Sequence, residues 1–133
     1  MRLALPEAVL EAQDRQTLGK LGEDMACREL ERRGYAIIAR RFRTRFGEID
    51  IVSDDHGTIA FVEVRARKST YRGTAAESVT ASKQRRIAAM ALDYLSRAGK
   101  LEARCRFDVV AIDGIGTEDA ELRVIEDAFQ VDH

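Results

Sequence analysis

Apolar residues recur with helical spacing in two segments of the chain. The first predicts a helix over residues 18–33, because Thr17 can cap its start and Gly34 supplies a natural stop. The second, over residues 80–99, has the pattern of a capped amphipathic helix that ends at a glycine. Residues 1–16 precede the first helix and are expected to form an N-terminal extension.

Strands are predicted where polar and apolar residues alternate with a period of two and where short apolar runs occur. These segments are residues 35–39, 47–53, 58–67 and 104–113, with a weaker edge strand at 121–125. Residues 54–57 (DDHG) have turn composition, so the second and third strands should form a β-hairpin. The remaining residues 40–46 and 68–77 are expected to be connections. The order α-β-β-β-α-β predicts one α/β domain over residues 17–133, with a mixed central sheet flanked by helices.

The composition agrees with one small globular domain. Of 133 residues, 45% are apolar and 34% are charged. No apolar run approaches the ~20 residues that span a bilayer, and acidic residues come too early for a secretory signal, so we expect a cytoplasmic protein with no membrane association. Cys27 and Cys105 lack metal-ligand spacing and are expected to be free, buried thiols. His56 and His133 are too few for a histidine-rich zinc centre.

Charge is strongly segregated along the chain, although the net charge is only -1. Residues 46–64 contain five acidic and no basic residues. By contrast, residues 20–45 hold eight Lys or Arg against four Asp or Glu, and residues 65–106 hold eleven against three. A metal-dependent enzyme that acts on a polyanion needs such a pattern, because Mg²⁺ binds carboxylates and phosphates attract cations. An ordinary solvated surface is the alternative explanation.

The hairpin carries the sharpest chemical signal, because its turn length decides whether Asp50 and Glu63 meet. A two-residue turn places them directly opposite one another, a four-residue turn makes them diagonal neighbours, and a three-residue turn puts them on opposite faces. Glu63 interrupts the apolar run Ile59–Val64, where an uncompensated carboxylate is costly. Two facing carboxylates can share one divalent cation, which removes that cost and their repulsion. The alternative is a salt bridge from Glu63 to an arginine such as Arg65 or Arg106.

The spacing of Asp50, Glu63 and Arg65 resembles the signature of the PD-(D/E)xK nuclease superfamily, and the element order resembles its restriction-endonuclease-like core. From about Gly19 to Ile112 the chain is similar to the YraN family of small bacterial proteins, which are regarded as predicted nucleases similar to archaeal Holliday junction resolvases. The residues that carry this similarity are Gly19, Glu23, Ala26, Gly47–Asp50, Phe61–Arg65, Ser82, Lys83 and Arg106–Val110.

The resemblance implies an endonuclease that uses Mg²⁺ or Mn²⁺ to hydrolyse phosphodiester bonds in DNA, with branched or structured DNA as its favoured substrate. Asp50 and Glu63 would ligate the metal ion, and Glu23 on the first helix would complete the site. Glu23 shares a helical face with Gly19, Ala26 and Leu30, and the small residues allow the helix to approach the strands. The alternative for Glu23 is a solvated acid in the first helical turn, favoured by the helix dipole.

Arg65 departs from the superfamily pattern, which has a lysine at this position. Arginine can hold a phosphate, but with a pKa above ~12 it cannot act as a general base. Lys83, near the start of the second helix, is the candidate that positions the attacking water in its place. An ordinary exposed lysine is the alternative.

Cations on both sides of the acidic hairpin are expected to contact a nucleic-acid backbone, with solvated loops as the alternative. They are Arg40, Arg41, Arg43, Arg45, Arg67, Lys68 and Arg72. Few aromatic residues lie among them, which favours backbone contacts over extensive base stacking. Asp108 lies beside Arg106 in an apolar strand, and a structural charge pair explains both.

Two other functions stay open. In one, the same fold is a non-catalytic nucleic-acid-binding module whose carboxylates are structural. In the other, the chain is an adaptor whose acidic residues 113–133 bind a basic protein. Cutting both strands of a DNA junction requires two sites, so a nuclease of this kind is expected to be a homodimer.

Overall fold

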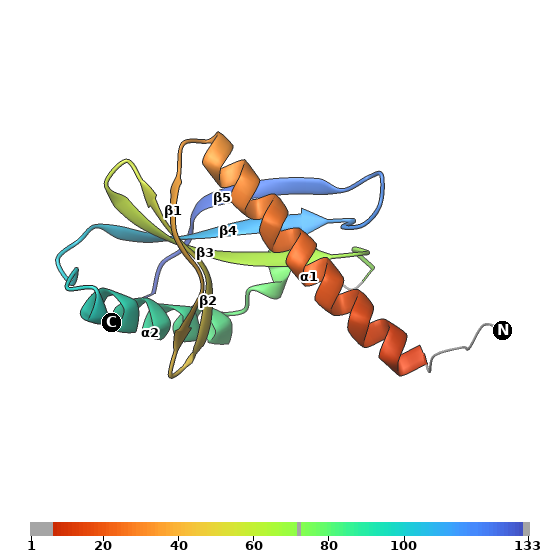
Figure 1. Cartoon of the computed structure of the whole chain (residues 1–133), viewed down its shortest axis with the longest axis horizontal. Coiled ribbons are helices and arrows are strands. Elements are labelled where there is room, and N and C mark those ends of the chain that lie inside the picture. Colours follow the sequence, from red (N-terminus) through yellow and green to blue (C-terminus); the bar gives the residue numbers. More distant parts are fainter. Residues whose placement is uncertain (1–6, 72, 132–133) are drawn as a thin grey trace.

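The computed structural model describes residues 7–71 and 73–131, and in this part of the chain two α-helices cover the two faces of one mixed sheet (Figure 1). The elements are α1 (Glu7–Arg32), β1 (Ala36–Thr44), β2 (Gly47–Asp55), β3 (Thr58–Arg67), a short 3₁₀ helix η1 (Ala76–Ser78), α2 (Ala81–Arg97), β4 (Cys105–Asp113) and β5 (Glu121–Phe129). The α-β-β-β-α-β order is confirmed, and β5 adds a full edge strand where only residues 121–125 were expected.

The strands lie in the order β1-β2-β3-β4-β5, and only the central β3–β4 pair is parallel. A parallel pair needs a long crossover, and α2 supplies it. Because side chains alternate along a strand, β3 contributes to both cores. Its Val62 packs with Ala26 and Leu30 of α1, whereas its Phe61 packs in the core beneath α2. None of the helices in residues 7–71 and 73–131 is long and apolar enough to cross a membrane.

The first helix starts earlier than the sequence predicted. It is already helical at Glu7, so the boundary expected at Thr17 is wrong, and Thr17 lies inside the helix. Residues 7–16 contain neither Gly nor Pro and are rich in good helix formers, so nothing stops the helix there. The expected stop is confirmed, because Gly34 has φ of 94° and the N–H of Tyr35 donates to the carbonyl of Leu30 (2.9 Å).

The arginine-rich segment after residue 39 is strand rather than connection. β1 continues to Thr44, and Phe42 pairs with Ile49 of β2. The Phe42 ring also contacts Tyr94 of α2 edge-on, with ring centroids 5.0 Å apart. Cross-strand pairing and this packing outweigh the polar composition that suggested a loop.

The hairpin turn has two residues, which selects one of the registers considered above. His56 and Gly57 have φ of 52° and 98°, as a type I′ turn requires, and the Gly57 N–H donates to Asp54 Oδ1 (2.7 Å). The two strands, β2 and β3, pair antiparallel from Asp55↔Thr58 onward.

The prediction that both cysteines are free, buried thiols is half right, because Cys27 is buried whereas Cys105 is exposed.

Candidate functional site

The candidate site lies where β2 separates from β3. The two strands pair from the turn as far as Ile51↔Val62, and β2 then stays paired with β1 alone. Two residues further along β3, the Val64 N–H donates to Oδ2 of Asp50 (2.8 Å) instead of to a backbone carbonyl of β2. The side chain of Asp50 therefore satisfies a backbone group at the separation, and its carboxylate is held at the level of Glu63.

Asp50 and Glu63 meet, as the two-residue turn predicts. The Ile51↔Val62 pair sets Asp50 opposite Glu63, each carboxyl group shifts the pKa of the other, and the Glu63 side chain is only 15% exposed. Burial and the neighbouring Asp50 charge raise the pKa of Glu63 to about 8. Burial also raises the pKa of Asp50, although the Val64 N–H works in the opposite direction. Near neutral pH this pair therefore holds one proton, which a divalent cation would have to displace.

Arg65 lies on the same face of β3 as Glu63, as expected. Its Nη1 is 3.6 Å from Glu63 Oε1, so the alternative of a salt bridge between Glu63 and Arg65 is present in the structure. Arg106 pairs with Asp55 and Asp108 instead. The Nε of Arg65 donates to the Ser78 hydroxyl (2.9 Å), and the hydroxyl donates in turn to the Ala75 carbonyl. Ser78, in η1, therefore orients the guanidinium.

Lys83 approaches the same cluster from the first turn of α2. Thr80 caps this helix as predicted, by accepting from the Lys83 N–H (3.3 Å). The ammonium Nζ donates to the Ser78 carbonyl (3.0 Å), and burial together with the nearby Arg65 lowers the pKa of Lys83. Lys83 is thus bound to the backbone beside the carboxyl pair.

Glu23 is buried on α1 but is held by two arginines. Its Oε1 accepts from Arg40 Nε (3.1 Å) and its Oε2 from Arg41 Nε (2.9 Å). The alternative of a solvated acid in the first turn is wrong, because α1 starts at least four turns earlier and Glu23 faces the sheet. In residues 7–71 and 73–131, no three His, Cys, Asp or Glu side chains gather as a metal-binding group. Glu23 therefore lies near Asp50 and Glu63 without joining them.

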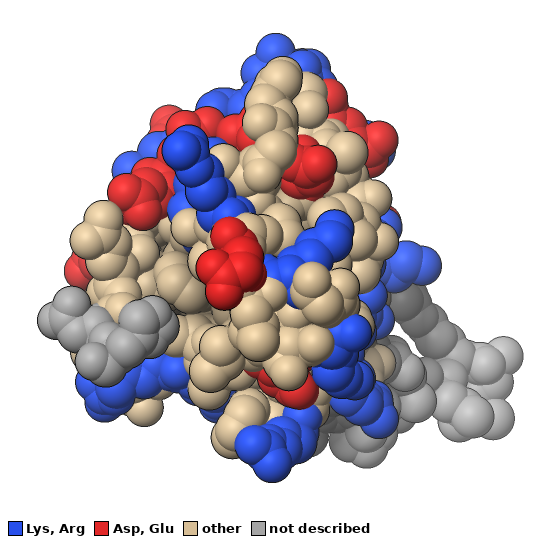
Figure 2. Space-filling view, turned by 90° about the vertical axis from the view of Figure 1, so that its left-hand side faces the viewer, with Lys and Arg blue, Asp and Glu red and all other residues tan. Residues whose placement is uncertain are grey.

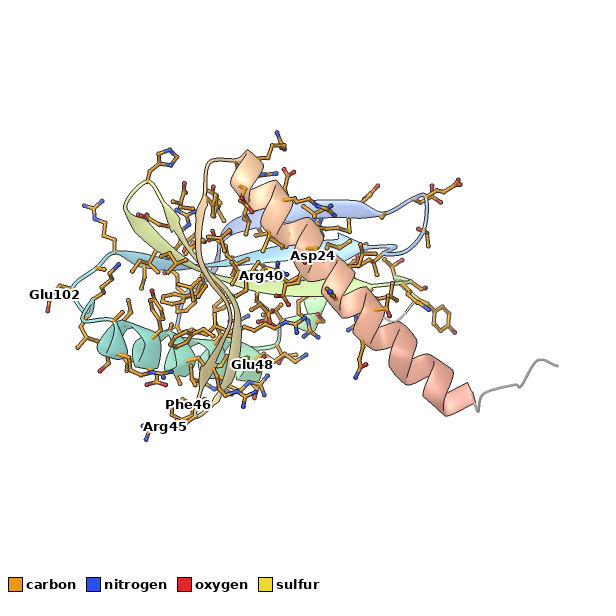
Figure 3. The ribbon with its side chains drawn as sticks, in the orientation of Figure 1. Asp24, Arg40, Arg45, Phe46, Glu48 and Glu102 are labelled. Atoms are coloured by element: carbon orange, nitrogen blue, oxygen red, sulfur yellow. The ribbon has the colours of Figure 1, made fainter. Side chains whose placement is uncertain are left out.

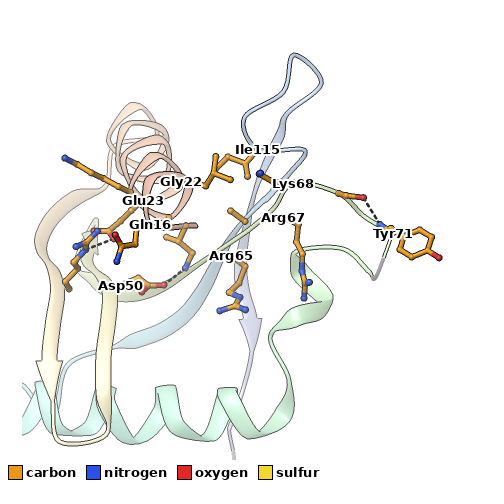
Figure 4. Close-up of a pocket in the computed structure, with 16 residues that line it drawn as sticks. Gln16, Gly22, Glu23, Asp50, Arg65, Arg67, Lys68, Tyr71 and Ile115 are labelled. Atoms are coloured by element: carbon orange, nitrogen blue, oxygen red, sulfur yellow. Dashed lines mark hydrogen bonds and ion pairs between the residues drawn. The ribbon is translucent and has the colours of Figure 1, made fainter. Parts of the chain in front are cut away.

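A groove of about 1180 Å³ opens beside Asp50 (Figure 4). One wall is the segment of α1 from Gln16 to Glu23, and the other is the end of β3 with the loop that reaches Tyr71. Among the residues that the structure describes, five cations line it: Lys20, Arg41, Arg65, Arg67 and Lys68. The groove thus has one acidic region, at Asp50 and Glu23, within a largely basic lining.

Only some of the predicted phosphate-binding residues line the groove, and others lie elsewhere. Arg41, Arg67 and Lys68 line the groove. Arg40 donates to Asp24 (2.7 Å) and to Glu23 (3.1 Å), and Figure 3 shows Arg40 close to Asp24. Arg43 pairs with Glu48 (3.2 Å), and the Arg45 guanidinium lies 5.0 Å from the centre of the Phe46 ring, at the tip of the β1–β2 hairpin. Arg72 lies outside the described residues.

Away from the groove, the surface of the described residues does not have a largely basic character. Figure 2 shows the side of the molecule at the left of Figure 1, where acidic and basic side chains are interspersed. Close to the β2–β3 turn, the charge pair predicted between Asp108 and Arg106 is confirmed, with Nε 3.0 Å from Oδ1. Tyr35 and Asp55 join this network through the same arginine.

Sequence reasoning missed Lys20 and Ser78. Lys20 follows Gly19 on the helix that carries Glu23, so extending the helical-face analysis by one residue could have found it. Ser78 has no comparable signal, because its role depends on η1 folding back against β3 and β4. The Ala75 N–H in that segment donates to Asp113 Oδ1 (2.8 Å).

Comparison with known proteins places the chain in a family. The family model described as "Uncharacterised protein family UPF0102" matches residues 22–112. A UPF0102 protein of Ralstonia pickettii is 50% identical over 118 residues, which cover 86% of this chain and 90% of the relative. One from Desulfosudis oleivorans is 45% identical over 115 residues (86% and 91%), and one from Symbiobacterium thermophilum is 45% identical over 112 (84% and 95%). The chain therefore belongs to the UPF0102 family, the YraN family that its motifs predicted.

Proposed function

We propose that this protein hydrolyses phosphodiester bonds in nucleic acid with a divalent metal ion held by Asp50 and Glu63. One observation carries the proposal: two carboxyl groups from neighbouring strands face each other beside a groove whose described lining includes five cations. Two facing carboxyl groups repel when both are ionised, which makes them poor structural elements but suitable cation ligands.

The donor set fits Mg²⁺ or Mn²⁺. Both ions prefer carboxylate oxygens, and Mg²⁺ is commonly held by one or two carboxylates together with waters and substrate phosphates. Asp50 and Glu63 supply two such groups, and a cation between them offsets the burial and repulsion that raise the Glu63 pKa. When bound, the metal ion would polarise the scissile phosphate and lower the pKa of a bound water.

The residues around the pair would position the substrate. Arg65, oriented by Ser78, is suited to hold a phosphate oxygen. Lys83 is the proposed group that orients the attacking water, and its lowered pKa brings it nearer to neutral pH. Arg41, Arg67 and Lys68 would hold the flanking backbone.

The substrate proposed from the family resemblance is branched or structured DNA, cut by a homodimer. The test is incubation with linear, flapped and four-way DNA, with and without Mn²⁺. We expect metal-dependent cleavage by the wild type and a loss of at least about 100-fold in Asp50→Asn, because a metal ligand is lost while the amide oxygen still accepts from Val64. Glu48→Gln, an exposed acid two residues away on β2, is the matched control and should retain activity. Equal cleavage by wild type and Asp50→Asn would contradict the proposal.

A second candidate is a nucleic-acid-binding module without catalysis. It is favoured by the ion pairs that occupy both oxygens of Glu23, the residue expected to complete the metal site. Calorimetric titration with Mn²⁺ separates the two functions. A binding heat that disappears in Asp50→Asn supports the phosphodiesterase, whereas equal heats for both proteins support the binding module.

A further inference from the structure

We infer that the groove beside Asp50 binds an unpaired stretch of a nucleic-acid strand rather than an intact duplex. The inference rests on the proposed function, because it names the part of the substrate that enters the same groove. Four observations carry it: the apolar floor, the cations on both walls, the exposed ring of Tyr71 and the size of the groove.

The floor of the groove is apolar. Leu18 of α1, Val64 and Ala66 of β3, and Ile115 after β4 all line it. A duplex stacks the faces of its bases internally and presents phosphates and base edges to a protein. An unpaired strand also exposes base faces, which gain from contact with an apolar or aromatic surface. The apolar floor is therefore better suited to an unpaired strand than to a duplex.

The walls are cationic on both sides of that floor. Lys20 projects from α1 and Arg41 from β1, while Arg67 and Lys68 lie at the end of β3. A basic groove that follows the backbone, combined with surfaces on which bases stack, is the usual arrangement for binding single strands.

Tyr71 supplies an aromatic surface at the outer end of the groove. Along the strand and the loop that follows it, Arg65, Arg67 and Tyr71 follow one another outward from Asp50 (Figure 4). The tyrosine is 92% exposed, although an aromatic ring of this size is normally buried in large part. Its ring is therefore accessible to a base.

The groove is also larger than a site for one small metabolite. Its volume of about 1180 Å³ exceeds the ~300–1,000 Å³ that is typical of small-molecule pockets. Its lining extends from Asp50 to Tyr71, which suits several consecutive nucleotides.

Gly19 offers a way to block the groove without disturbing the fold. It lies on α1 in the groove wall, and a Cβ placed on it meets no atom within 4 Å. Alanine and leucine both favour a helix over glycine, so neither substitution should destabilise α1. A leucine extends into the groove, whereas an alanine leaves most of the space open.

The test measures fluorescence anisotropy of labelled 12-nucleotide deoxyuridine and uridine strands and of a blunt DNA duplex, in EDTA so that no hydrolysis occurs. We expect the wild type and Gly19→Ala to bind a single strand at least about 10-fold more tightly than the duplex. Gly19→Leu should lose this preference, and Tyr71→Ala should bind about 5- to 150-fold more weakly, as expected for one lost base stack, while Tyr71→Phe retains affinity.

Equal affinity for the duplex and the single strands, or unchanged binding by Gly19→Leu, would overturn the inference. The two labelled single strands show whether the 2′-hydroxyl matters. Binding is measured without metal, so the two claims can fail separately. Single-strand binding without any cleavage would support this inference and contradict the proposed hydrolysis. Cleavage of duplex DNA without a single-strand preference would support the hydrolysis and contradict this inference.

Discussion

Arg41 donates from its Nε to Oε2 of Glu23 (2.9 Å), and it does so from a backbone φ of 51°. A non-glycine residue in this left-handed region costs of the order of 1–2 kcal/mol, so the neighbouring strand pairs must hold it there. Those pairs are Arg40↔Ile51 and Phe42↔Ile49, on either side of the level of Asp50. A strained arginine thus holds Glu23, the acid that the sequence predicted would join the carboxyl pair.

Removing that arginine should strengthen metal binding. We expect Arg41→Gly, which suits the positive φ, to bind Mn²⁺ about threefold to tenfold more tightly, because a cation is removed and one Glu23 oxygen becomes available. Calorimetric titration measures the change. Arg43→Gly, on the same strand but paired with Glu48, is the control and should leave the affinity unchanged. Weaker or equal binding by Arg41→Gly would mean that Glu23 is purely structural.

Glu63 should make the fold less stable as the pH rises. Its pKa is about 8 in the folded protein and near 4.5 when unfolded, so the folded state holds the extra proton between these values. The stabilising contribution is therefore complete below pH 4.5 and is lost as pH rises through 8, by up to roughly 1 kcal/mol per pH unit. Urea unfolding at pH 6, 7 and 8 measures this slope.

Glu63→Gln is the control for that slope, because its amide can still donate to Asp50 but cannot ionise. The variant should be more stable than the wild type at pH 8 and should lose the part of the slope that Glu63 contributes. If the free energy of unfolding changed with pH by the same amount in the two proteins, the folded wild type would not carry an extra proton on Glu63.

Metal binding should release a proton. At pH 7 the Asp50–Glu63 pair holds one proton, and an ion bound between the carboxylates displaces it. We expect Mg²⁺ affinity to rise by up to about tenfold per pH unit between pH 6 and 8 and to level off above. Calorimetry in two buffers of different ionisation enthalpy counts the released protons. A pH-independent affinity would place the ion somewhere other than between these two groups.

Asp108 should be among the most sensitive positions for stability. It is 0% exposed and accepts from the Tyr35 hydroxyl (3.0 Å), the Arg106 Nε (3.0 Å) and the Asp127 N–H (2.9 Å). We expect Asp108→Ala to lower the free energy of unfolding by about 3–5 kcal/mol, because the partly buried Arg106 loses a fully buried counter-charge and keeps only Asp55 at a comparable distance. Chemical denaturation measures the loss.

The comparison is Asp93→Ala, which breaks a partly exposed pair with Arg97 on α2 (3.3 Å) and should cost less than about 1 kcal/mol. A similar small cost for Asp108→Ala would mean that the buried network is compensated by other contacts.

The pairing of the two site carboxyls was predicted from sequence as the outcome of two of the three turn lengths considered. The DDHG composition indicates a turn without fixing its length, whereas the structure shows two turn residues, His56 and Gly57, with φ above zero. Once that length is known, strand alternation fixes which residues face each other. The helix cap at Thr80 and the stop at Gly34 follow from equally local rules. Each depends on residues within a few positions.

Other features depend on segments that are far apart in the chain. Glu23 and Arg41 are 18 positions apart, and Ser78 and Arg65 are 13 apart, so no periodicity indicates that either pair forms. The extension of β1 through its arginines depends on Phe42 packing against Tyr94 of α2. Such contacts form only when the sheet and helices are packed, because they are selected by burial and cross-strand pairing rather than by local propensity.

The sequence by itself therefore determined the element order and limited the hairpin to a few registers, two of which bring Asp50 and Glu63 onto one face, since strand periodicity acts over short distances. The structure selected the two-residue turn that places them opposite one another. Only the tertiary structure decided that β2 leaves β3 at Asp50, that Glu23 is occupied by two guanidinium groups, and that a basic groove opens between α1 and the end of β3. These features depend on which buried charges and hydrogen-bonding groups of the helix and the strands are paired with one another. Such pairs form only in the folded chain, because their members are far apart in the sequence.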